Sequence, residues 1–425
     1  MKLIYVVLDG VGDLPIRELD NETPLGAAET PNMDSLAREG KTGLMYTVRK
    51  GIAPESDVAV ISILGYDPFK YASGRGILEA VGAGLQVKNG DLTLRCNFAT
   101  LGTGQQIIDR RAGRNLTTEE SLQLSQTVNE KVTLEAYPAD FEFKSTIGHR
   151  AVLVIRSRAG PLSSLITNTD PGYTRLKGLG VAEKEVEMII KTCEPMDESS
   201  EAMVSAELVN EFIHESHKVL GEHEVNKNRI AEGKLAANVI LTRDAGDKLP
   251  KFFSIGGRYH VRFTCLADMP VERGIAKLAG MSLVDLPPPS YDLKNDCLLR
   301  VKKLLEVLPL YDCFYIHIKG PDEPGHDGDC QLKKQLITII DRYFFGELVK
   351  KIHLSDHVLC VTADHSTPCI LRAHSDDPVP ILIAGNAIHG GNTVKFSEKE
   401  CRKGSLGILQ KGTELMPLLM NYING

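Results

Sequence analysis

The chain has 425 residues, of which 42% are hydrophobic and 25% are charged, and its formal net charge is −7 with a pI of about 6.0. This length and composition are those of a globular protein with about two domains. The acidic balance argues against nucleic acid or an anionic membrane as a partner, and no apolar segment is long enough to span a bilayer. Nine cysteines without a C-x-x-C pair indicate a reduced protein of the cytoplasm.

Short, nearly continuous apolar runs predict buried strands at residues 3–10, 313–322, 357–365 and 379–385. Runs that are apolar on both faces are typical of strands inside a parallel sheet. Apolar residues at helical spacing predict helices over residues 32–40, 296–308 and 331–352. The alternation of strands and helices predicts an α/β fold, in which helices sandwich a mostly parallel sheet.

The middle of the chain, from about residue 86 to 256, is richer in polar residues. It contains a predicted strand at 150–156 and predicted amphipathic helices at 181–190 and 205–221. We therefore expect a smaller α+β domain, residues 86–256, inserted into a core formed by residues 1–75 and 257–425. The hinges are expected near residues 73–85 and 243–258.

Three aspartates stand at or shortly after the ends of predicted strands: Asp9, Asp322 and Asp364. Ligands of open α/β sheets bind beyond the carboxyl ends of the strands. Although these aspartates are hundreds of residues apart in the chain, the sheet is expected to bring them to one edge. The sequence therefore predicts a functional site there.

Three histidines accompany these aspartates. Asp322 and His326 form a D-x-x-x-H pattern in a loop rich in proline and glycine, His365 follows Asp364 directly, and His374 precedes a predicted strand. Each pattern taken alone is also that of an ordinary loop, and the other nine histidines are expected to be ordinary surface or core residues. Together the three carboxylates and three imidazoles make a ligand set for two divalent ions, and mixed nitrogen and oxygen ligands favour Mn²⁺, Zn²⁺, Co²⁺ or Mg²⁺.

Ser56 heads the apolar run in APESDVAV (53–60) and has two possible roles. Its hydroxyl could cap the free N–H groups at a helix N-terminus, although Ala59 excludes the reciprocal capping box. It could also be a nucleophile, because a helix N-terminus stabilises a phosphorylated serine. The converging metal-ligand candidates favour the second role without excluding the first.

The motifs together resemble those of the alkaline phosphatase superfamily, most closely the archaeal type of cofactor-independent phosphoglycerate mutases. They occur in the family's order over almost the whole chain. The stretches are VVLDGVGD (6–13), TPLGAAETPNMDSLAREG (23–40), PESDVAVISILGYDP (54–68), GRGILEAVGAGL (74–85), RCNFAT (95–100), DRRAGR (109–114), PDEPGHDGD (321–329), TADHSTP (362–368) and HSDDPVP (374–380).

The resemblance implies an alkaline-phosphatase-like sheet and a role for each candidate. Asp9, Ser56, Asp364 and His365 would bind one divalent ion, with Ser56 also accepting the phosphoryl group. The other ion would be bound by Asp322, His326 and His374. Mn²⁺ is the favoured metal, no bisphosphoglycerate is expected, and Glu55 departs from the smaller residue expected before the serine.

A basic cluster in the middle of the chain offers binding groups for a carboxylate or phosphate, which arginine can hold with two parallel hydrogen bonds. A dense arginine cluster can equally be a solvated surface. Within the resemblance these cations are expected to bind substrate. The candidates are Arg110, Arg111, Arg114, His149, Arg150 and Arg243.

The resulting hypothesis is an isomerase that interconverts 3-phosphoglycerate and 2-phosphoglycerate, small-molecule substrates, through a phosphoserine at Ser56. One alternative is another metalloenzyme of the superfamily, such as a phosphomonoesterase, a phosphonate hydrolase or a phosphopentomutase. A second alternative is a metal-binding protein without catalysis, which would not need the serine. Release of free phosphate, or metal binding without turnover, would favour these alternatives.

Overall fold

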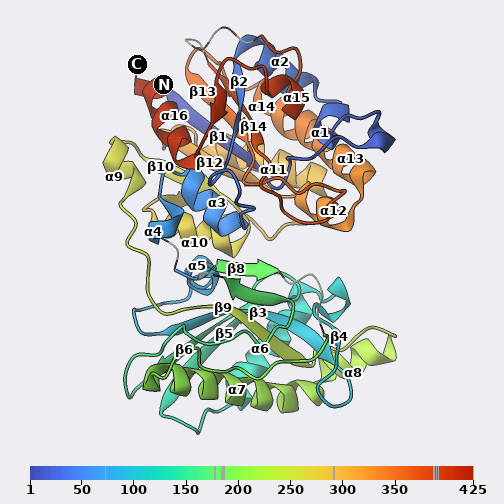
Figure 1. The fold of residues 1–425 in the computed structure, drawn as a ribbon, viewed down its shortest axis with the longest axis vertical. Coiled ribbons are helices and arrows are strands. Elements are labelled where there is room, and N and C mark those ends of the chain that lie inside the picture. The colour runs from blue at the N-terminus through green and yellow to red at the C-terminus, as the bar shows by residue number, and fades with distance from the viewer. Residues whose placement is uncertain are drawn as a thin grey trace. The chain divides into compact units, whose positions relative to one another are not determined.

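The computed structural model describes residues 1–425 except 72, 177–178, 183–186, 291, 386–387, 389, 391 and 425 (Figure 1). The chain forms two compact units. Unit 1 comprises Met1–Tyr71, Phe252–Asp268 and Ile275–Gly425, and unit 2 comprises Ala72–Lys251 and Met269–Gly274. The functions expected of the two domains stay predictions.

Unit 1 is built on an eight-stranded sheet with the strand order β11-β10-β12-β1-β13-β14-β2-β15. Its strands are β1 (Lys2–Leu8), β2 (Lys41–Met45), β10 (Phe263–Leu266), β11 (Ser282–Leu283), β12 (Cys313–Ile318), β13 (His357–Thr362), β14 (Val379–Ala384) and β15 (Gly407–Leu409). The first five strands of the order are parallel to one another, and β15 is parallel to β2. The predicted α/β class with a mostly parallel sheet is therefore confirmed.

The run at 379–385 is a strand, as predicted, but its expected parallel direction is wrong. Strand β14 runs antiparallel to both β13 and β2. The connection over residues 363–378 contains no helix to carry the chain back across the sheet. Without such a crossover, a strand that follows its neighbour directly returns in the opposite direction.

The central strands of unit 1 are buried on both faces, as the continuous apolar runs predict. Every residue of β12, β13 and β14 is buried, and so are the last six residues of β1. Full burial of one aliphatic side chain stabilises the fold by about 1.5–3 kcal/mol. These strands therefore provide a rigid base for the loops at their carboxyl ends.

The helices of unit 1 include the three predicted ones. Residues 32–40 lie in α2 (Pro31–Glu39) and residues 296–308 in α11 (Leu293–Val307). The run at 331–352 begins as α13 (Cys330–Ile340) and continues through a π-turn, η3 (Asp341–Phe345), into α14 (Gly346–Leu348). The remaining helices are η1 (Arg17–Leu19), α1 (Pro24–Ala27), α3 (Ser56–Ile63), α4 (Pro68–Tyr71), α9 (Ile255–Tyr259), α12 (Asp322–Asp327), α15 (Glu398–Cys401), η4 (Gly412–Glu414) and α16 (Leu415–Asn424).

Unit 2 has an antiparallel sheet in which β3 pairs with β4, β6 and β9, and β6 also pairs with β5. Its elements are α5 (Arg75–Gly82), β3 (Leu92–Leu101), β4 (Ile107–Asp109), η2 (Ala112–Arg114), α6 (Thr118–Lys131), β5 (Ala139–Ser145), β6 (Arg150–Ser157), β7 (Tyr173–Leu176), β8 (Leu179–Ala182), α7 (Ser200–Gly221), α8 (Glu224–Ala231) and β9 (Val239–Gly246). Helix α10 (Pro270–Leu278) is divided between the two units. The predicted strand 150–156 and helix 205–221 correspond to β6 and α7.

The two faces of strand β3 differ in chemistry. Leu94, Cys96 and Phe98 belong to the main apolar core of unit 2, which also includes residues of α6 and α7. Arg95 and Asn97 alternate with them and are also buried. Because side chains alternate between faces along a strand, one face of the sheet is apolar and the other carries polar groups.

The helix predicted at 181–190 is wrong in the residues that the structure describes. Val181 and Ala182 belong to β8, which pairs with β7. Farther along, Met188 and Ile190 hydrogen-bond through their backbones to Ile107 and Gln105. Pairing with distant backbone thus overrides the local helical pattern, and residues 183–186 lie outside the described part.

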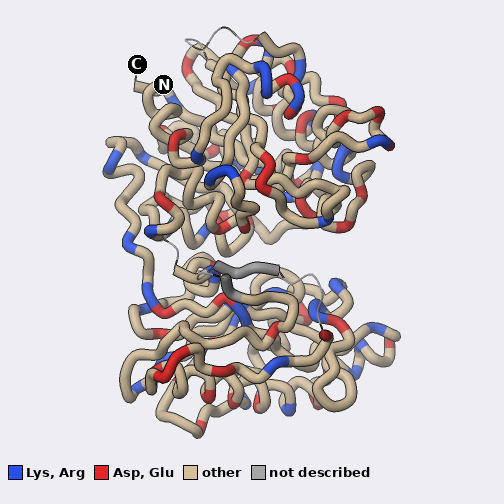
Figure 2. Tube along the Cα trace, viewed as in Figure 1, with Lys and Arg blue, Asp and Glu red and all other residues tan. Residues whose placement is uncertain are grey.

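Among the described helices, none is long and apolar enough to cross a membrane. Acidic and basic residues are interspersed along the chain in each unit (Figure 2). All nine cysteines are free thiols in buried positions.

Candidate metal centre

The aspartates expected at the edge of the sheet follow three adjacent strands, because β1 lies between β12 and β13. Asp9 comes directly after β1, and Asp364 is the second residue after β13. Asp322 begins the short helix α12, which follows β12. The structure brings these three residues together with His326, His365 and His374 in two adjacent groups of three.

The inner group consists of Asp9, Asp364 and His365, whose side chains are at most 7% exposed. His365 Nε2 lies 3.6 Å from Asp9 Oδ1 and 3.3 Å from Asp364 Oδ2. The other oxygen of Asp364 accepts hydrogen bonds from the backbone N–H groups of Gly10 and His365, both at 3.0 Å. Asp9 Oδ1 and Asp364 Oδ2, although buried, accept no hydrogen bond from any described residue.

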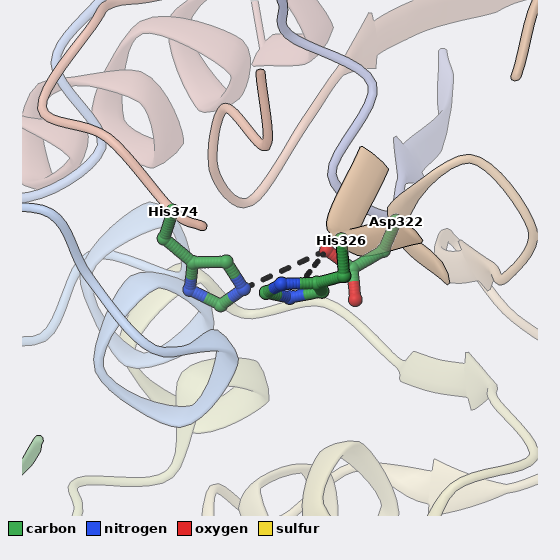
Figure 3. A group of neighbouring side chains, drawn as sticks. All are labelled: Asp322, His326 and His374. Carbon is green, nitrogen blue, oxygen red and sulfur yellow. Dashed lines mark ion pairs between the residues drawn. The ribbon is translucent and has the colours of Figure 1, made fainter. Parts of the chain in front are cut away.

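The outer group consists of Asp322, His326 and His374 (Figure 3). Asp322 Oδ1 lies 3.5 Å from His326 Nε2 and 3.6 Å from His374 Nε2, and the two imidazoles point toward it. Each ring is held from behind by a backbone carbonyl. His326 Nδ1 lies 3.2 Å from the carbonyl oxygen of Arg372, and His374 Nδ1 lies 2.8 Å from that of Pro54.

These contacts fit two divalent ions. A carbonyl oxygen only accepts, so each Nδ1 carries a hydrogen, and when the ring is neutral each Nε2 presents its lone pair to the carboxylate. A lone pair and a carboxylate oxygen repel each other unless a proton or a cation lies between them. Imidazoles held by a backbone carbonyl through the opposite nitrogen are the usual arrangement of histidine ligands. In the inner group, Asp9 and Asp364 each have one buried oxygen that accepts no hydrogen bond from a described residue. These oxygens also need a cation.

The pKa values of the two groups reflect this need for positive charge. Burial raises the pKa of Asp9, but the Lys319 ammonium and the His317 and His365 imidazoles outweigh burial and leave the pKa well below its usual value. Burial lowers the pKa of His374, but the carboxylates of Asp322 and Glu55 outweigh burial and raise the pKa to about 9. Asp9 is thus ionised among positively charged groups, whereas the outer carboxylates attract a proton to His374, which a bound metal would replace.

Ser56 is the first residue of α3, and the N-cap position belongs to Glu55. The interpretation of Ser56 as the capping residue is therefore wrong, and no side chain caps this helix among the described residues. The Ser56 hydroxyl instead lies 3.2 Å from Nε2 of His365, at the inner group. Glu55 Oε1 lies 3.9 Å from Nδ1 of His374.

Sequence reasoning missed three side chains at this site. Lys319 Nζ lies 3.1 Å from Asp9 Oδ2, and His317, which was expected to be ordinary, lies 3.8 Å from Asp9 Oδ1 and 3.7 Å from Asp364 Oδ2. The Thr367 hydroxyl lies between His365 and Asp322. The position of Lys319 just after β12 is a signal that could have identified it, since the ends of strands also identified the aspartates.

The binding candidates of unit 2 differ in whether they already have an anionic partner. Arg110 makes two hydrogen bonds to the buried carboxylate of Asp170, at 2.6 and 2.8 Å, and so already has an anionic partner. His149 is surrounded by cations. Burial is the main cause that lowers the pKa of His149 to about 2, and the guanidinium groups of Arg150, Arg111, Arg95 and Arg114 add to it. His149 is therefore neutral.

A second group of cations lies on the polar face of the unit 2 sheet. Arg95 is 8% exposed and forms an ion pair with buried Glu79 at 3.2 Å. Arg243 pairs with Arg95 across β3 and β9, is 5% exposed, and stacks over the ring of Tyr173 at 3.4 Å. The Nε atom of Arg243 donates no hydrogen bond to any described residue. Buried guanidinium groups with spare donors make this face suitable for an anion.

Comparison with known proteins identifies the family. A family model described as 2,3-bisphosphoglycerate-independent phosphoglycerate mutase matches residues 37–226. A protein of that name from Aeropyrum pernix is 40% identical over 432 residues, which cover 100% of both chains. A protein of the same name from Thermococcus kodakarensis is 38% identical over 426 residues, covering 100% of this chain and 97% of the relative.

Solved structures agree with these relatives. PH0037 protein from Pyrococcus horikoshii matches with a TM-score of 0.78 and 30% identity, covering 100% of this chain and 97% of its own. The cofactor-independent phosphoglycerate mutase from Thermoplasma acidophilum matches with a TM-score of 0.61 and 31% identity, covering 100% of both chains. The resemblance expected from the motifs is confirmed, and the chain belongs to the 2,3-bisphosphoglycerate-independent phosphoglycerate mutase family of enzymes.

Proposed function

We propose that this enzyme interconverts 3-phosphoglycerate and 2-phosphoglycerate through a phosphoserine at Ser56, without a bisphosphoglycerate primer. The observation that carries the proposal is the position of the Ser56 hydroxyl, 3.2 Å from His365 Nε2 and beside the carboxylates of the inner group. Membership of the mutase family supports the choice of substrate. A purely structural serine in this place would need no neighbouring set of ligand side chains.

In this proposal Asp9, Asp364, His365 and Ser56 hold one divalent ion, and Asp322, His326 and His374 hold the other. Two bound ions would lower the pKa of the serine hydroxyl and offset the negative charge on the phosphoryl oxygens. Mn²⁺ is the metal we favour, with Zn²⁺, Co²⁺ and Mg²⁺ as alternatives, because the ligands are nitrogen and oxygen atoms without a thiolate.

The reaction consists of two half-reactions at Ser56. In the first, the serine hydroxyl loses its proton and its oxygen bonds to phosphorus, the bond from phosphorus to one glycerate oxygen breaks, and that oxygen takes up a proton. In the second, the other glycerate hydroxyl loses its proton and bonds to phosphorus, and the serine oxygen leaves and regains a proton. The N–H groups and the dipole at the start of α3 stabilise the charge of the phosphoserine between the two steps.

Retention of glycerate separates a mutase from a phosphatase, because water would otherwise take the phosphoryl group. We propose that the cations of unit 2 are carboxylate-binding groups for the substrate. Arg95 and Arg243 offer buried guanidinium groups, and neutral His149 offers a hydrogen bond. Arg111, Arg114 and Arg150 add positive charge, whereas Arg110 is already bound to Asp170.

The other sequence-based expectations belong to the same proposal. The substrate is a small phosphorylated acid, and neither nucleic acid nor a membrane takes part. The nine buried free thiols support a location in the cytoplasm, where thiols stay reduced.

The test is an enolase-coupled assay of 2-phosphoglycerate formation, with and without Mn²⁺, while free phosphate is measured in parallel. We expect Ser56→Ala and removal of metal by a chelator each to abolish turnover. Ser62→Ala is the matched control, because Ser62 lies on the same helix, is fully buried, and makes no side-chain hydrogen bond to a described residue.

The outcomes separate the alternatives. Turnover of 3-phosphoglycerate by Ser56→Ala at the wild-type rate would overturn the phosphoserine mechanism. Stoichiometric release of free phosphate by the wild-type enzyme would identify a phosphomonoesterase instead of a mutase. Tight binding of Mn²⁺ without turnover of any phosphoester would identify a metal-binding protein.

A further inference from the structure

We propose that Thr367 is a positioning residue that fixes the tautomer of His365 and couples the two ligand groups of the metal centre. This inference rests on the proposed function, because it concerns the same site. Its basis is the Thr367 hydroxyl, which contacts His365 of the inner group and Asp322 of the outer group. No other described hydroxyl hydrogen-bonds to a candidate ligand from each group.

The direction of the two hydrogen bonds follows from the chemistry of the partners. Thr367 Oγ1 lies 2.7 Å from Asp322 Oδ1, and an ionised carboxylate can only accept, so the hydroxyl hydrogen lies on this bond. The hydroxyl oxygen is then left to accept the hydrogen of His365 Nδ1, which is 3.0 Å away. His365 Nε2 therefore carries a lone pair and faces Asp9, Asp364 and the Ser56 hydroxyl.

The threonine is itself held in place from several sides. It is fully buried, its backbone N–H donates to the carbonyl of Gly12 at 2.9 Å, and its own carbonyl accepts from Lys333 Nζ at 2.8 Å. Gly10 leaves room for the hydroxyl, since a Cβ atom there would lie 2.7 Å from Thr367 Oγ1. Gly325 likewise leaves room for the methyl group, because a Cβ atom at this position would lie 2.9 Å from Thr367 Cγ2. The side chain thus has little freedom to turn its hydroxyl elsewhere.

A shared hydroxyl makes the two groups interdependent. If Asp322 shifts when the outer group binds an ion, its hydrogen bond from the Thr367 hydroxyl shifts with it. The same hydroxyl accepts from His365, so the orientation of His365 changes as well. Coupling of this kind is reciprocal, so binding at the inner group also affects the outer group. Partners that orient histidine ligands typically contribute about 10- to 100-fold to metal affinity.

The experiment measures binding of Mn²⁺ alone, by calorimetry, to full-length protein that has been stripped of metal. We expect Thr367→Val, which keeps the shape and removes the hydroxyl, to weaken Mn²⁺ binding by about 10- to 100-fold. Thr367→Ser keeps the hydroxyl and should bind like the wild type. Thr264→Val is the matched control, because the buried Thr264 hydroxyl donates to a backbone carbonyl, that of Ser282, and contacts no candidate ligand.

A second readout does not depend on metal. Nitrogen-15 NMR of metal-free protein reports the tautomer of neutral histidines, and loss of a signal in His365→Gln assigns it to His365. We expect the Nδ1–H tautomer in the wild type and in Thr367→Ser, and a mixture of tautomers in Thr367→Val. If Thr367→Val does not fold, Thr367→Ala removes the same hydroxyl without adding bulk and is measured in its place.

Wild-type Mn²⁺ affinity together with an unchanged His365 tautomer in a folded hydroxyl-free variant would overturn the positioning role. Ser56→Ala would still be inactive in that case, so the proposed function would stand. Normal turnover by Ser56→Ala would instead overturn the proposed function, while the tautomer measurement on Thr367 would keep its meaning.

Discussion

The inner and outer ligand groups differ in how deeply they lie in the fold. The side chains of the inner group are 0–7% exposed, and two of them follow adjacent parallel strands within two residues. Those of the outer group are 12–41% exposed and are placed by a short helix and a loop. Binding at the inner group should therefore be linked to the stability of the sheet, whereas binding at the outer group should follow the metal concentration in solution.

The groups also differ in what supports them. Behind the inner group, fully buried Lys333 donates to the carboxylate of Asp13 at 2.8 Å and to the carbonyls of Gly12 and Thr367. The Asp13 carboxylate in turn accepts hydrogen bonds from the backbone N–H groups of Leu14 and Cys369. Removing one partner of a buried ion pair typically costs about 3–5 kcal/mol, so this network strongly constrains both loops. The outer histidines are held by single backbone carbonyls.

The largest effect is expected for the inner group. Asp364→Asn removes a charge and disturbs the acceptor of the Gly10 and His365 N–H groups. Turnover should fall on the order of 1,000-fold, as when a main electrostatic partner is lost, and the free energy of unfolding should fall by about 1–3 kcal/mol. Enolase-coupled kinetics and urea unfolding measure the two effects. A variant with normal stability would show that the inner group is not part of the folded core.

A smaller effect, of a different kind, is expected for the outer group. His326 is 41% exposed, so His326→Gln should change the free energy of unfolding by less than about 0.5 kcal/mol. The Mn²⁺ concentration needed for half-maximal activity should rise by about 10- to 100-fold, and excess Mn²⁺ should restore turnover. If turnover stays low at saturating Mn²⁺, His326 does more than bind an exchangeable ion, and the contrast between the two groups fails.

A third effect, with no direct bearing on turnover, concerns pH and the network behind the inner group. Glu398 accepts hydrogen bonds from the Asp13 backbone and the Thr23 hydroxyl. Burial is the main cause that raises the pKa of Glu398 to about 7, and the charge of Asp13 adds to it. A carboxyl whose pKa is raised by folding binds its proton more tightly in the folded state. Its contribution to stability is therefore lost as pH rises through that pKa.

We expect the free energy of unfolding of the wild type to fall by about 1–3 kcal/mol between about pH 5 and pH 8. Glu398→Gln mimics the protonated side chain and should flatten this part of the profile. Glu400→Gln, on the same helix but more exposed, should keep the wild-type slope. If the unfolding free energy has the same pH dependence in all three proteins, Glu398 is not the titrating group.

The sequence predicted the sheet and its functional edge because both depend on strong, local signals. Continuous apolar runs identified β1, β12, β13 and β14 of the eight strands, and each aspartate candidate stands at or shortly after the end of such a run. The structure brings together all seven side chains proposed from these signals, although their role as ligands stays a prediction. The three predicted helices of unit 1, at 32–40, 296–308 and 331–352, followed equally clear apolar spacing.

What the sequence did not reveal depends on contacts between distant segments. Lys333 lies in an ordinary helical pattern, and nothing local shows that its ammonium reaches the backbone of Gly12. Nothing near Arg95 in the sequence shows that the pairing of β3 with β9 brings Arg243 beside it. The segment 181–190 has helical spacing, but of its described residues Val181 and Ala182 pair with β7, and Met188 and Ile190 hydrogen-bond through their backbones to Ile107 and Gln105. Such pairings can be known only once the chain is folded.

The order of the ligands along the chain has a consequence for synthesis of the protein. Asp9 precedes its partner His365 by more than three hundred residues, and the outer group also needs His374, which comes later still. The network centred on Lys333 likewise joins segments from both ends of this interval. A nascent chain on the ribosome therefore holds neither complete group until residues 365 and 374 have been made. If the two groups bind metal as proposed, metal loading follows synthesis of both segments, and a truncated chain ending before His365 is expected to bind Mn²⁺ poorly.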